Sequence, residues 1–328
     1  MTKILVTRAI PGVLTVPGAE VIIGPDAGYL GEGELRAFVR EHAPIDALVT
    51  MVHDRVDADL LDAAGDALKV VCNFAVGYDN IDVPACAARS VAVCNTPYAV
   101  TEGTADVAWA LLLSAARRVH EGRRHIESGA YARRGVLGMR EMLGVDIAGR
   151  TLLIVGAGRI GYATALRSIG WGMRVLYVAR RRHFSFEFAP LNATRIGLDE
   201  GLAEADFISL HTPLTDQTRH LINADRLRLV KPTAVLVNTA RGPVVDERAL
   251  IDALREGRLF AAGLDVHEHE PDVPAELVSL PNVVLTPHVG SGARRYREMM
   301  TEIVAANIHA ILTGADPVGL VFRPATQE

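Results

Sequence analysis

The feature that most constrains how this chain folds is a glycine-rich turn directly after a short apolar run near the middle of the sequence. Residues 151–161 read TLLIVGAGRIG, so the apolar run 152–155 is followed by glycines in the G-x-G-x-x-G spacing. An Ala-rich segment, 160–169, predicts a helix that Gly170 can end, and 174–178 predicts a second strand. This order of elements indicates a β-α-β unit that binds a dinucleotide rather than an ordinary Gly-rich turn.

The three glycines have separate roles in that interpretation. Gly156 allows the tight turn, Gly158 lets a pyrophosphate approach the backbone, and Gly161 lets the helix pack closely against the strand. The first turn of the helix offers unpaired N–H groups and a partial positive charge to the phosphates.

Length and composition exclude several classes of function. A chain of 328 residues favours two domains. The net charge is −5 and the only basic block is 180–182, so we expect neither nucleic acid nor an anionic membrane as a partner. No apolar run reaches the roughly 18 residues of a membrane span, and the N-terminus lacks the pattern of a signal peptide, so a cytoplasmic location is expected. The odd set Cys72, Cys86 and Cys94, without C-x-x-C, predicts buried reduced thiols.

Strand-like and helix-like segments alternate along the chain, which predicts an α/β fold with doubly wound parallel sheets. The expected strands are 3–7, 19–23, 47–51, 69–73, 91–94, 207–211, 234–238, 261–264 and 283–286; the expected helices are 33–41, 56–64, 83–89, 100–118 and 294–312. Residues 122–149 have poor periodicity and are interpreted as an arm or loop. A long helix at each end of the nucleotide-binding unit indicates a discontinuous domain, 1–98 with 290–328, beside a dinucleotide-binding domain, 99–289.

The end of the second strand bears on the choice of cofactor. A turn that binds NAD usually has an Asp or Glu there to hold the ribose 2′-OH. Here Arg180, Arg181 and Arg182 follow instead, and guanidinium groups bind a 2′-phosphate in bidentate fashion. We therefore predict NADP(H), with a solvated basic turn and dual use of NAD and NADP as the alternative.

Three side chains at the ends of later strands could take part in catalysis or substrate binding. Hydride transfer to a carbonyl requires a proton donor, for which a histidine beside a carboxylate is suited. An anionic substrate also requires a cation, and arginine binds a carboxylate in bidentate fashion. Arg241, Glu270 and His288 follow predicted strands, where open α/β sheets bind their ligands.

Each of the three also has a simpler explanation. Arg241 could form a surface ion pair, and His288 is one of eleven histidines. A metal site formed by residues 267–270, HEHE, is disfavoured because zinc-binding pairs on helices prefer i,i+4 spacing and Pro271 interrupts this turn.

Together the segments resemble the D-isomer-specific 2-hydroxyacid dehydrogenase family along nearly the whole chain, most closely its NADP-using glyoxylate/hydroxypyruvate reductases. The matching segments are VGYDNID at 76–82, the glycine turn, DFISLHTPLT at 206–215, NTARG at 238–242, GLDV at 263–266 with Glu270-Pro271, and TPHVGS at 286–291. The resemblance implies a flavodoxin-like substrate-binding domain and a Rossmann-like dinucleotide-binding domain, with a cleft between them that closes, and a homodimer.

The resemblance also implies residue roles. Arg241 would bind the substrate carboxylate and polarise the carbonyl, His288 would protonate the nascent alkoxide, and Glu270 would pair with His288. Backbone N–H groups of Val76 and Gly77 would hold the substrate carboxylate, and Asp265 would bond to the nicotinamide side. The cofactor would further be lined by Thr104, Gly156, Gly158, Arg159, Ile160, Gly161, Arg180, Arg181, Arg182, Thr212, Pro213, Thr239, Ala240, Arg241, His288 and Gly290.

One departure from the family concerns the size of the substrate. The arm, 129–143, lacks the tryptophan that many relatives carry there, and Met139 and Met142 are flexible apolar fillers. The pocket would then accept a substrate larger than glyoxylate, unless the arm simply packs a dimer interface. For the protein as a whole, the alternatives to an NADPH-dependent reductase are a NAD-linked D-2-hydroxyacid dehydrogenase for a larger substrate and a dinucleotide-sensing corepressor-like interaction protein.

Overall fold

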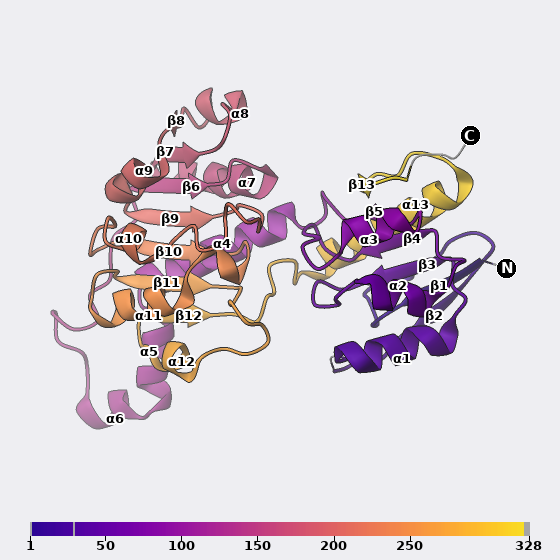
Figure 1. The fold of residues 1–328 in the computed structure, drawn as a ribbon. Helices are drawn as coiled ribbons and strands as arrows, with labels where there is room; N and C mark the ends of the chain where they lie inside the picture. Colours follow the sequence, from indigo (N-terminus) through magenta and orange to yellow (C-terminus); the bar gives the residue numbers. More distant parts are fainter. Residues whose placement is uncertain (1, 29, 325–328) are drawn as a thin grey trace. The chain divides into compact units, whose positions relative to one another are not determined.

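The computed structural model describes residues 2–28 and 30–324, which form two compact units. One unit comprises Met1–Val100 with Ser291–Glu328, and the other comprises Thr101–Gly290. The chain therefore leaves the first unit before a long helix and returns to it before the last one (Figure 1). The junctions lie two residues and one residue beyond the predicted ones.

The discontinuous unit contains a six-stranded sheet in the order β13-β5-β4-β3-β1-β2. Its elements are β1 Thr2–Val6, β2 Ala19–Ile23, α1 Glu32–His42, β3 Ala47–Thr50, α2 Ala58–Ala64, β4 Val70–Asn73, α3 Val83–Ala88, β5 Ala92–Cys94, α13 Arg294–Thr313 and β13 Leu320–Phe322. Strands β1 to β5 are parallel in the order 2-1-3-4-5, the flavodoxin-like arrangement that the resemblance implied.

Alternate residues of β1 explain the three layers of this unit. Leu5 packs under α1, α2 and α3 on one face, whereas Ile4 and Val6 pack under α13 on the other. Full burial on both faces is what makes such a strand read as a continuous apolar run. Cys72, Cys86 and Cys94 are buried free thiols in these layers, as predicted.

The continuous unit contains a seven-stranded sheet in the order β12-β11-β10-β9-β6-β7-β8, with all strands parallel. Its strands are β6 Thr151–Val155, β7 Arg174–Val178, β8 Thr194–Arg195, β9 Phe207–Leu210, β10 Val235–Asn238, β11 Ala261–Leu264 and β12 Val283–Leu285. Its helices are α4 Thr101–Ala116, α5 Val119–Glu127, α6 Ala130–Arg134, α7 Arg159–Arg167, α8 Phe184–Glu187, α9 Leu198–Glu204, α10 Ala224–Leu227, α11 Glu247–Arg255 and α12 Ala275–Ser279. The chain moves outward from β6 in both directions, so the sheet's topological switch point lies beside β6.

The first strand of this sheet separates two cores. Leu152 and Ile154 face the cluster beneath α4 and α7, and Leu153 and Val155 face the cluster beneath α9, α10 and α11 (Figure 1). Helices thus cover both faces, and the parallel sheet presents its carboxyl ends along one edge. No helix of the described part of the chain combines the length and apolar character needed to cross a membrane.

Three local predictions were wrong. The first part of the predicted arm, 122–149, lies in α5 and α6, because ion pairs such as Arg123–Glu127 support helices that bury no residue; residues 135–149 are irregular as predicted. The helix after the glycine turn continues as a 3₁₀ segment to Trp171, and Gly172 with φ 61°, not Gly170, ends it. Finally, β13 pairs with β5 in the antiparallel direction, so the first sheet is not wholly parallel.

Candidate active site

The glycine turn between β6 and α7 has the shape that a bound pyrophosphate requires. Gly156 adopts φ +105°, and a Cβ there would lie 2.7 Å from the backbone of His211, so a larger residue is excluded. A Cβ at Gly161 would lie 2.2 Å from the carbonyl oxygen of Gly156, which enforces close packing of helix and strand. At Gly158, in contrast, nothing lies within 4 Å of the added atom, and this exposed position precedes the first turn of α7. The turn therefore leaves room for an anion where the N–H groups of α7 begin.

Polar groups along the same edge of the sheet also fit a dinucleotide. Thr212 and Pro213 follow β9, and Thr239 and Ala240 follow β10. The Thr239 hydroxyl is buried, yet it has no hydrogen-bond partner among the described residues. A buried hydroxyl of this kind calls for a polar partner, which a bound cofactor would supply. Thr104 lies in the first turn of α4, close to Gly290. If Gly290 carried a side chain, its Cβ would lie 3.2 Å from the Thr104 hydroxyl.

The arginines after β7 differ in their surroundings. Arg180 and Arg181 are exposed, and within the described residues their guanidinium groups form no hydrogen bond or ion pair. Arg182 instead forms an ion pair with Glu187, whose carboxylate also accepts a hydrogen bond of 2.6 Å from the Tyr177 hydroxyl. These bonds from Arg182 and Tyr177 lower the pKa of Glu187 to about 2. Arg182 therefore already has an anionic partner, unlike the other two arginines.

A fourth arginine, which the sequence interpretation missed, holds this turn from the neighbouring strand β8. Arg195 donates to the carbonyl oxygen of Ala179 at 3.0 and 3.1 Å and to that of Arg180 at 3.0 Å. These bonds fix the backbone from which Arg180 projects. The contact joins residues about 15 apart, across a loop whose course the sequence pattern does not reveal.

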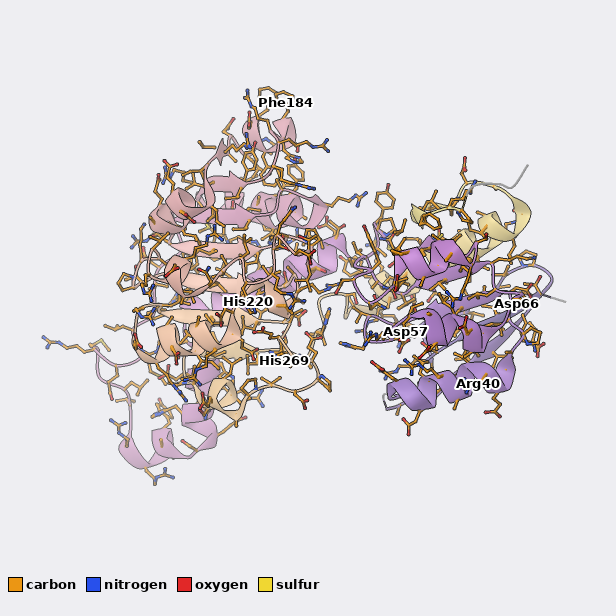
Figure 2. All side chains as sticks on the ribbon, viewed as in Figure 1. Arg40, Asp57, Asp66, Phe184, His220 and His269 are labelled. Atoms are coloured by element: carbon orange, nitrogen blue, oxygen red, sulfur yellow. The ribbon has the colours of Figure 1, made fainter. Side chains whose placement is uncertain are left out.

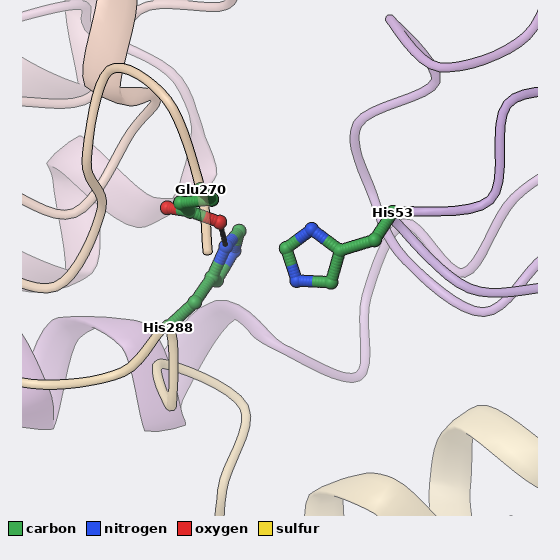
Figure 3. A group of neighbouring side chains, drawn as sticks. All are labelled: His53, Glu270 and His288. Atoms are coloured by element: carbon green, nitrogen blue, oxygen red, sulfur yellow. Dashed lines mark hydrogen bonds and ion pairs between the residues drawn. The ribbon is translucent and has the colours of Figure 1, made fainter. Parts of the chain in front are cut away.

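His288 and Glu270 form a hydrogen-bonded pair, as Figure 3 shows. The Nδ1 atom of His288 lies 2.8 Å from Oε2 of Glu270, and the two side chains are 22% and 16% exposed. The other carboxylate oxygen of Glu270 accepts the backbone N–H of His267 at 2.9 Å, which holds the carboxylate in place. The structure thus brings together two of the three predicted catalytic side chains.

The backbone around His288 is held by Asp265, which is 1% exposed. One Asp265 oxygen accepts the Thr286 hydroxyl at 2.6 Å and the Val289 N–H at 2.8 Å, and the other accepts the Gly290 N–H at 2.8 Å. The carbonyl oxygen of Asp265 also accepts the His288 N–H at 2.8 Å. His288 has φ +53°, a left-handed conformation that costs a non-glycine residue energy. Asp265 therefore fixes the backbone of the turn from which the His288 ring projects.

Arg241 follows β10 in a turn that is braced by Asn238. The Asn238 side chain accepts the Ala240 N–H at 3.0 Å and donates to the Arg241 carbonyl oxygen at 2.9 Å. The guanidinium of Arg241 donates to the Ala240 carbonyl oxygen at 2.8 Å, and the residue is half-buried. Asn238 belongs to the NTARG segment, but its bracing role emerges only from the contacts.

Other histidines near this edge have different environments. Burial lowers the pKa of the His211 imidazole to about 3, so this ring is neutral at physiological pH. The ring of His267 contacts the Thr286 carbonyl oxygen at 3.1 Å, and that of His220 pairs with Glu268 at 2.6 Å. Figure 2 labels His220 on the larger unit. Only His288, of these four, pairs with Glu270, the carboxylate predicted for the site.

The predicted substrate-contacting residues of the other unit, Val76 and Gly77, lie in the loop after β4. Both are half-buried. The loop leaves the carboxyl end of a strand, which is where the corresponding site of the larger unit also forms.

Comparison with known sequences gives a family model that matches more than half of the chain and relatives that match nearly all of it. The model for the D-isomer specific 2-hydroxyacid dehydrogenase NAD binding domain matches residues 109–290. A glyoxylate reductase of Thermococcus onnurineus is 49% identical over 325 residues, which cover 98% of this chain and 96% of that protein.

Solved structures give the same picture for the fold. A protein from Thermus thermophilus is 43% identical with a TM-score of 0.86, covering 98% of this chain and all of that one (100%). An NADPH-dependent glyoxylate/hydroxypyruvate reductase of Sinorhizobium meliloti, solved with NADP and malonate, is 32% identical with a TM-score of 0.82 and 99% coverage of both chains. The likeness thus extends over both units and not only over the glycine turn.

Proposed function

The chain belongs to the D-isomer-specific 2-hydroxyacid dehydrogenase family, and on that premise we propose that it reduces glyoxylate or hydroxypyruvate with NADPH as the preferred cofactor. The substrate class, a small 2-keto acid, follows from the glyoxylate reductases to which the chain is similar over nearly its full length. The observation that carries the chemistry is the pairing of His288 with Glu270 at the edge of a dinucleotide-binding sheet.

The protein's own contribution to the reaction is positioning and proton transfer. A nicotinamide cofactor, when bound, supplies the hydride that is added to the carbonyl carbon. The Nδ1 atom of His288 is hydrogen-bonded to Glu270, so its Nε2 atom is the one that gives a proton to the carbonyl oxygen. Glu270 fixes the orientation of the ring and stabilises its protonated form.

The substrate's carboxylate requires a partner on the protein. We assign this role to Arg241 and to the backbone N–H groups at Val76 and Gly77. A guanidinium holds a carboxylate through two parallel hydrogen bonds, and it can at the same time polarise an adjacent carbonyl. An aldehyde or ketone that lacks the carboxylate cannot form these bonds, so it loses the binding and orientation that they supply.

The preference for NADPH rests on Arg180 and Arg181. Both are exposed after β7, where the ribose 2′-phosphate of NADP would lie, and no described carboxylate holds them. A charge-assisted contact to phosphate is worth about 1.5–3 kcal/mol, which corresponds to about tenfold or more in affinity. Arg182, which Glu187 neutralises, contributes less to this preference than the other two arginines.

One assay of NADPH oxidation tests the reaction and its substrate class. Glyoxylate and hydroxypyruvate should be reduced, whereas the rates with acetaldehyde and acetone should be lower by about 10³-fold or more. Arg241→Lys should raise KM for glyoxylate, because an ammonium cannot reproduce the planar fork. Comparable rates with acetone, or an unchanged KM in Arg241→Lys, would show that the site does not recognise a carboxylate.

A comparison of NADPH with NADH tests the cofactor preference. The unmodified enzyme should have a kcat/KM with NADPH about tenfold or more above that with NADH. Replacing Arg180 and Arg181 together by alanine should remove the preference through KM for NADPH, and Arg182→Ala is the matched control with a smaller effect. Equal use of both cofactors by the unmodified enzyme contradicts the proposal.

We also propose that the enzyme is a homodimer. The helix α5 buries no residue in a single chain, and its apolar side chains Val119 and Ile126 are 59% and 65% exposed. An apolar helix face of this kind is suited to cover the same face of a second copy. Light scattering should give twice the mass of one chain, and Ile126→Asp should shift it towards the monomer; a monomeric unmodified protein contradicts the proposal.

A further inference from the structure

In the loop after β4, the carbonyl oxygens of Ala75, Val76 and Gly77 all accept hydrogen bonds. The Ala75 carbonyl oxygen accepts the backbone N–H of Thr96 at 2.9 Å. The Val76 carbonyl oxygen accepts Nδ2 of Asn95 at 2.7 Å, and the Gly77 carbonyl oxygen accepts Nδ2 of Asn73 at 2.7 Å. Three successive peptide groups are therefore held by donors on their carbonyl side.

The N–H groups of the same three peptides point away from the donors that hold the carbonyl groups. In a planar trans peptide the N–H points away from the C=O, so fixing the carbonyls aims the N–H groups of Val76, Gly77 and Tyr78 to the other side. None of these three N–H groups has a hydrogen-bond partner within residues 2–28 and 30–324. Backbone N–H groups are obligatory donors, so a row of three without acceptors is a site for an anion.

The orientation of the two asparagine side chains follows from their partners. Asn80 donates to the carbonyl oxygens of Met51 and Asp54 at 3.1 and 2.9 Å, and these oxygens can only accept. The Asn80 amide oxygen then faces Asn73 and accepts its Nδ2 at 2.9 Å. The amide oxygen of Asn73 accepts the Thr50 hydroxyl at 3.0 Å and Nδ2 of Asn80 at 3.3 Å. Asn73, which is fully buried, is thus oriented so that Nδ2 faces the loop.

We infer that Asn73 and Asn95 are positioning residues for substrate binding: by holding the carbonyls of Gly77 and Val76, they direct the N–H groups of residues 76–78 to the carboxylate of the 2-keto acid. This inference rests on the proposed function, which supplies the anion. A hydrogen bond to a peptide carbonyl also strengthens the N–H of the same peptide as a donor. The two carboxamides therefore act on the substrate through the backbone, without touching it.

Substitutions at Asn95 separate positioning from general packing. Asn95→Ala removes the donor to Val76, and Asn95→Asp places a carboxylate beside that carbonyl oxygen. The matched control is Asn307→Asp, because Asn307 is fully buried in the same unit and donates to the Asn95 backbone carbonyl at 2.9 Å, but makes no bond to residues 75–78.

The expected result is a change in KM for glyoxylate with little change in kcat. KM should rise about fivefold in Asn95→Ala and about tenfold or more in Asn95→Asp, the range for one lost hydrogen bond and for an added repulsion. KM for NADPH should stay within about twofold, and Asn307→Asp should leave KM for glyoxylate within about twofold. If Asn95→Asp does not fold, Asn95→Ala decides alone.

Calorimetry with oxalate, a dicarboxylate that is not reduced, makes the same comparison without turnover. Weaker oxalate binding in both Asn95 variants, with normal binding in Asn307→Asp, supports the positioning role even if glyoxylate is not the substrate. An unchanged KM and unchanged oxalate affinity in Asn95→Ala overturn the inference while leaving the proposed reaction intact. An equal loss in Asn307→Asp overturns it as well, because a general packing defect then explains the effect.

Discussion

Replacing Asp265 by asparagine should both destabilise the dinucleotide-binding unit and slow the reaction. The substitution keeps the size of the side chain but turns one of its two acceptor oxygens into an NH₂ donor. The Asp265 oxygens accept bonds from Thr286, Val289 and Gly290, and all three partners are donors. At least one of these bonds must therefore become a contact between two donors.

The magnitude follows from the bonds that are lost. A hydrogen bond to a charged group contributes about 1.5–3 kcal/mol, and an unpaired buried N–H costs about 1–3 kcal/mol. We expect a loss of about 2–4 kcal/mol in the free energy of unfolding. His288 sits in a left-handed conformation that itself costs roughly 1–2 kcal/mol, so the weakened turn should relax towards other conformations. A fall in kcat of about 10²-fold corresponds to roughly 2.8 kcal/mol of this loss appearing in the transition state.

Urea unfolding and steady-state kinetics measure the two effects separately. Asp206→Asn is the matched control: this carboxylate also accepts a backbone N–H, from Thr151 at 3.0 Å, but it precedes β9 at the amino edge of the sheet. The control should lose stability and keep kcat within about threefold. Equal losses of kcat in both variants, or a normal kcat in Asp265→Asn, would refute the reasoning that Asp265 positions His288.

Three further outcomes are expected. Glu270→Gln should lower kcat by about tenfold or more, whereas Glu268→Gln, which breaks the neighbouring pair with His220, should change kcat by less than about threefold; similar losses in both would contradict the special role of Glu270. Burial alone would raise the pKa of Glu268, but hydrogen bonds from His220 and from a backbone N–H outweigh it and lower the pKa below the ordinary 4.5. The resulting stability is present above that pH and is lost as the pH falls through the folded-state pKa, so acid unfolding curves should be shallower in Glu268→Gln than in the unmodified protein, and parallel curves would argue against the pair. Hydroxypyruvate should give D-glycerate on chiral chromatography, and the L-isomer would contradict the family's stereochemistry.

The sheets and the glycine turn could be predicted because their signals are local. Buried parallel strands read as short apolar runs, and the glycine spacing can be recognised within eleven residues even though Gly156 is required partly by the distant backbone of His211. Arg241, Glu270 and His288 were selected as candidates because each follows a predicted strand, and their catalytic roles stay a proposal. The family resemblance then specified their roles, which strand position alone does not distinguish from surface ion pairs.

The features that were missed depend on contacts between distant segments. Asn95 reaches Val76 across 19 residues, and Arg195 reaches the turn at Ala179 across 16. Arg182 follows two exposed arginines in sequence, yet its ion pair with Glu187 separates it from them. Helix α5 was missed because the predicted arm was taken to begin at residue 122, inside the helix, so Val119 and Ile126 of its exposed apolar face were not recognised as one stripe.

The role of His288 as proton donor is tested by the rate of NADPH oxidation in a single turnover with saturating glyoxylate, measured for the unmodified enzyme and for His288→Ala. General acid catalysis supplies about 10²–10⁴-fold, so the variant should be slower by that factor. Its affinity for NADPH, followed by cofactor fluorescence, should remain within about threefold, which shows that the fold is intact. A single-turnover rate within about tenfold of the unmodified enzyme, with NADPH bound normally, would contradict the assignment of His288 as the proton donor.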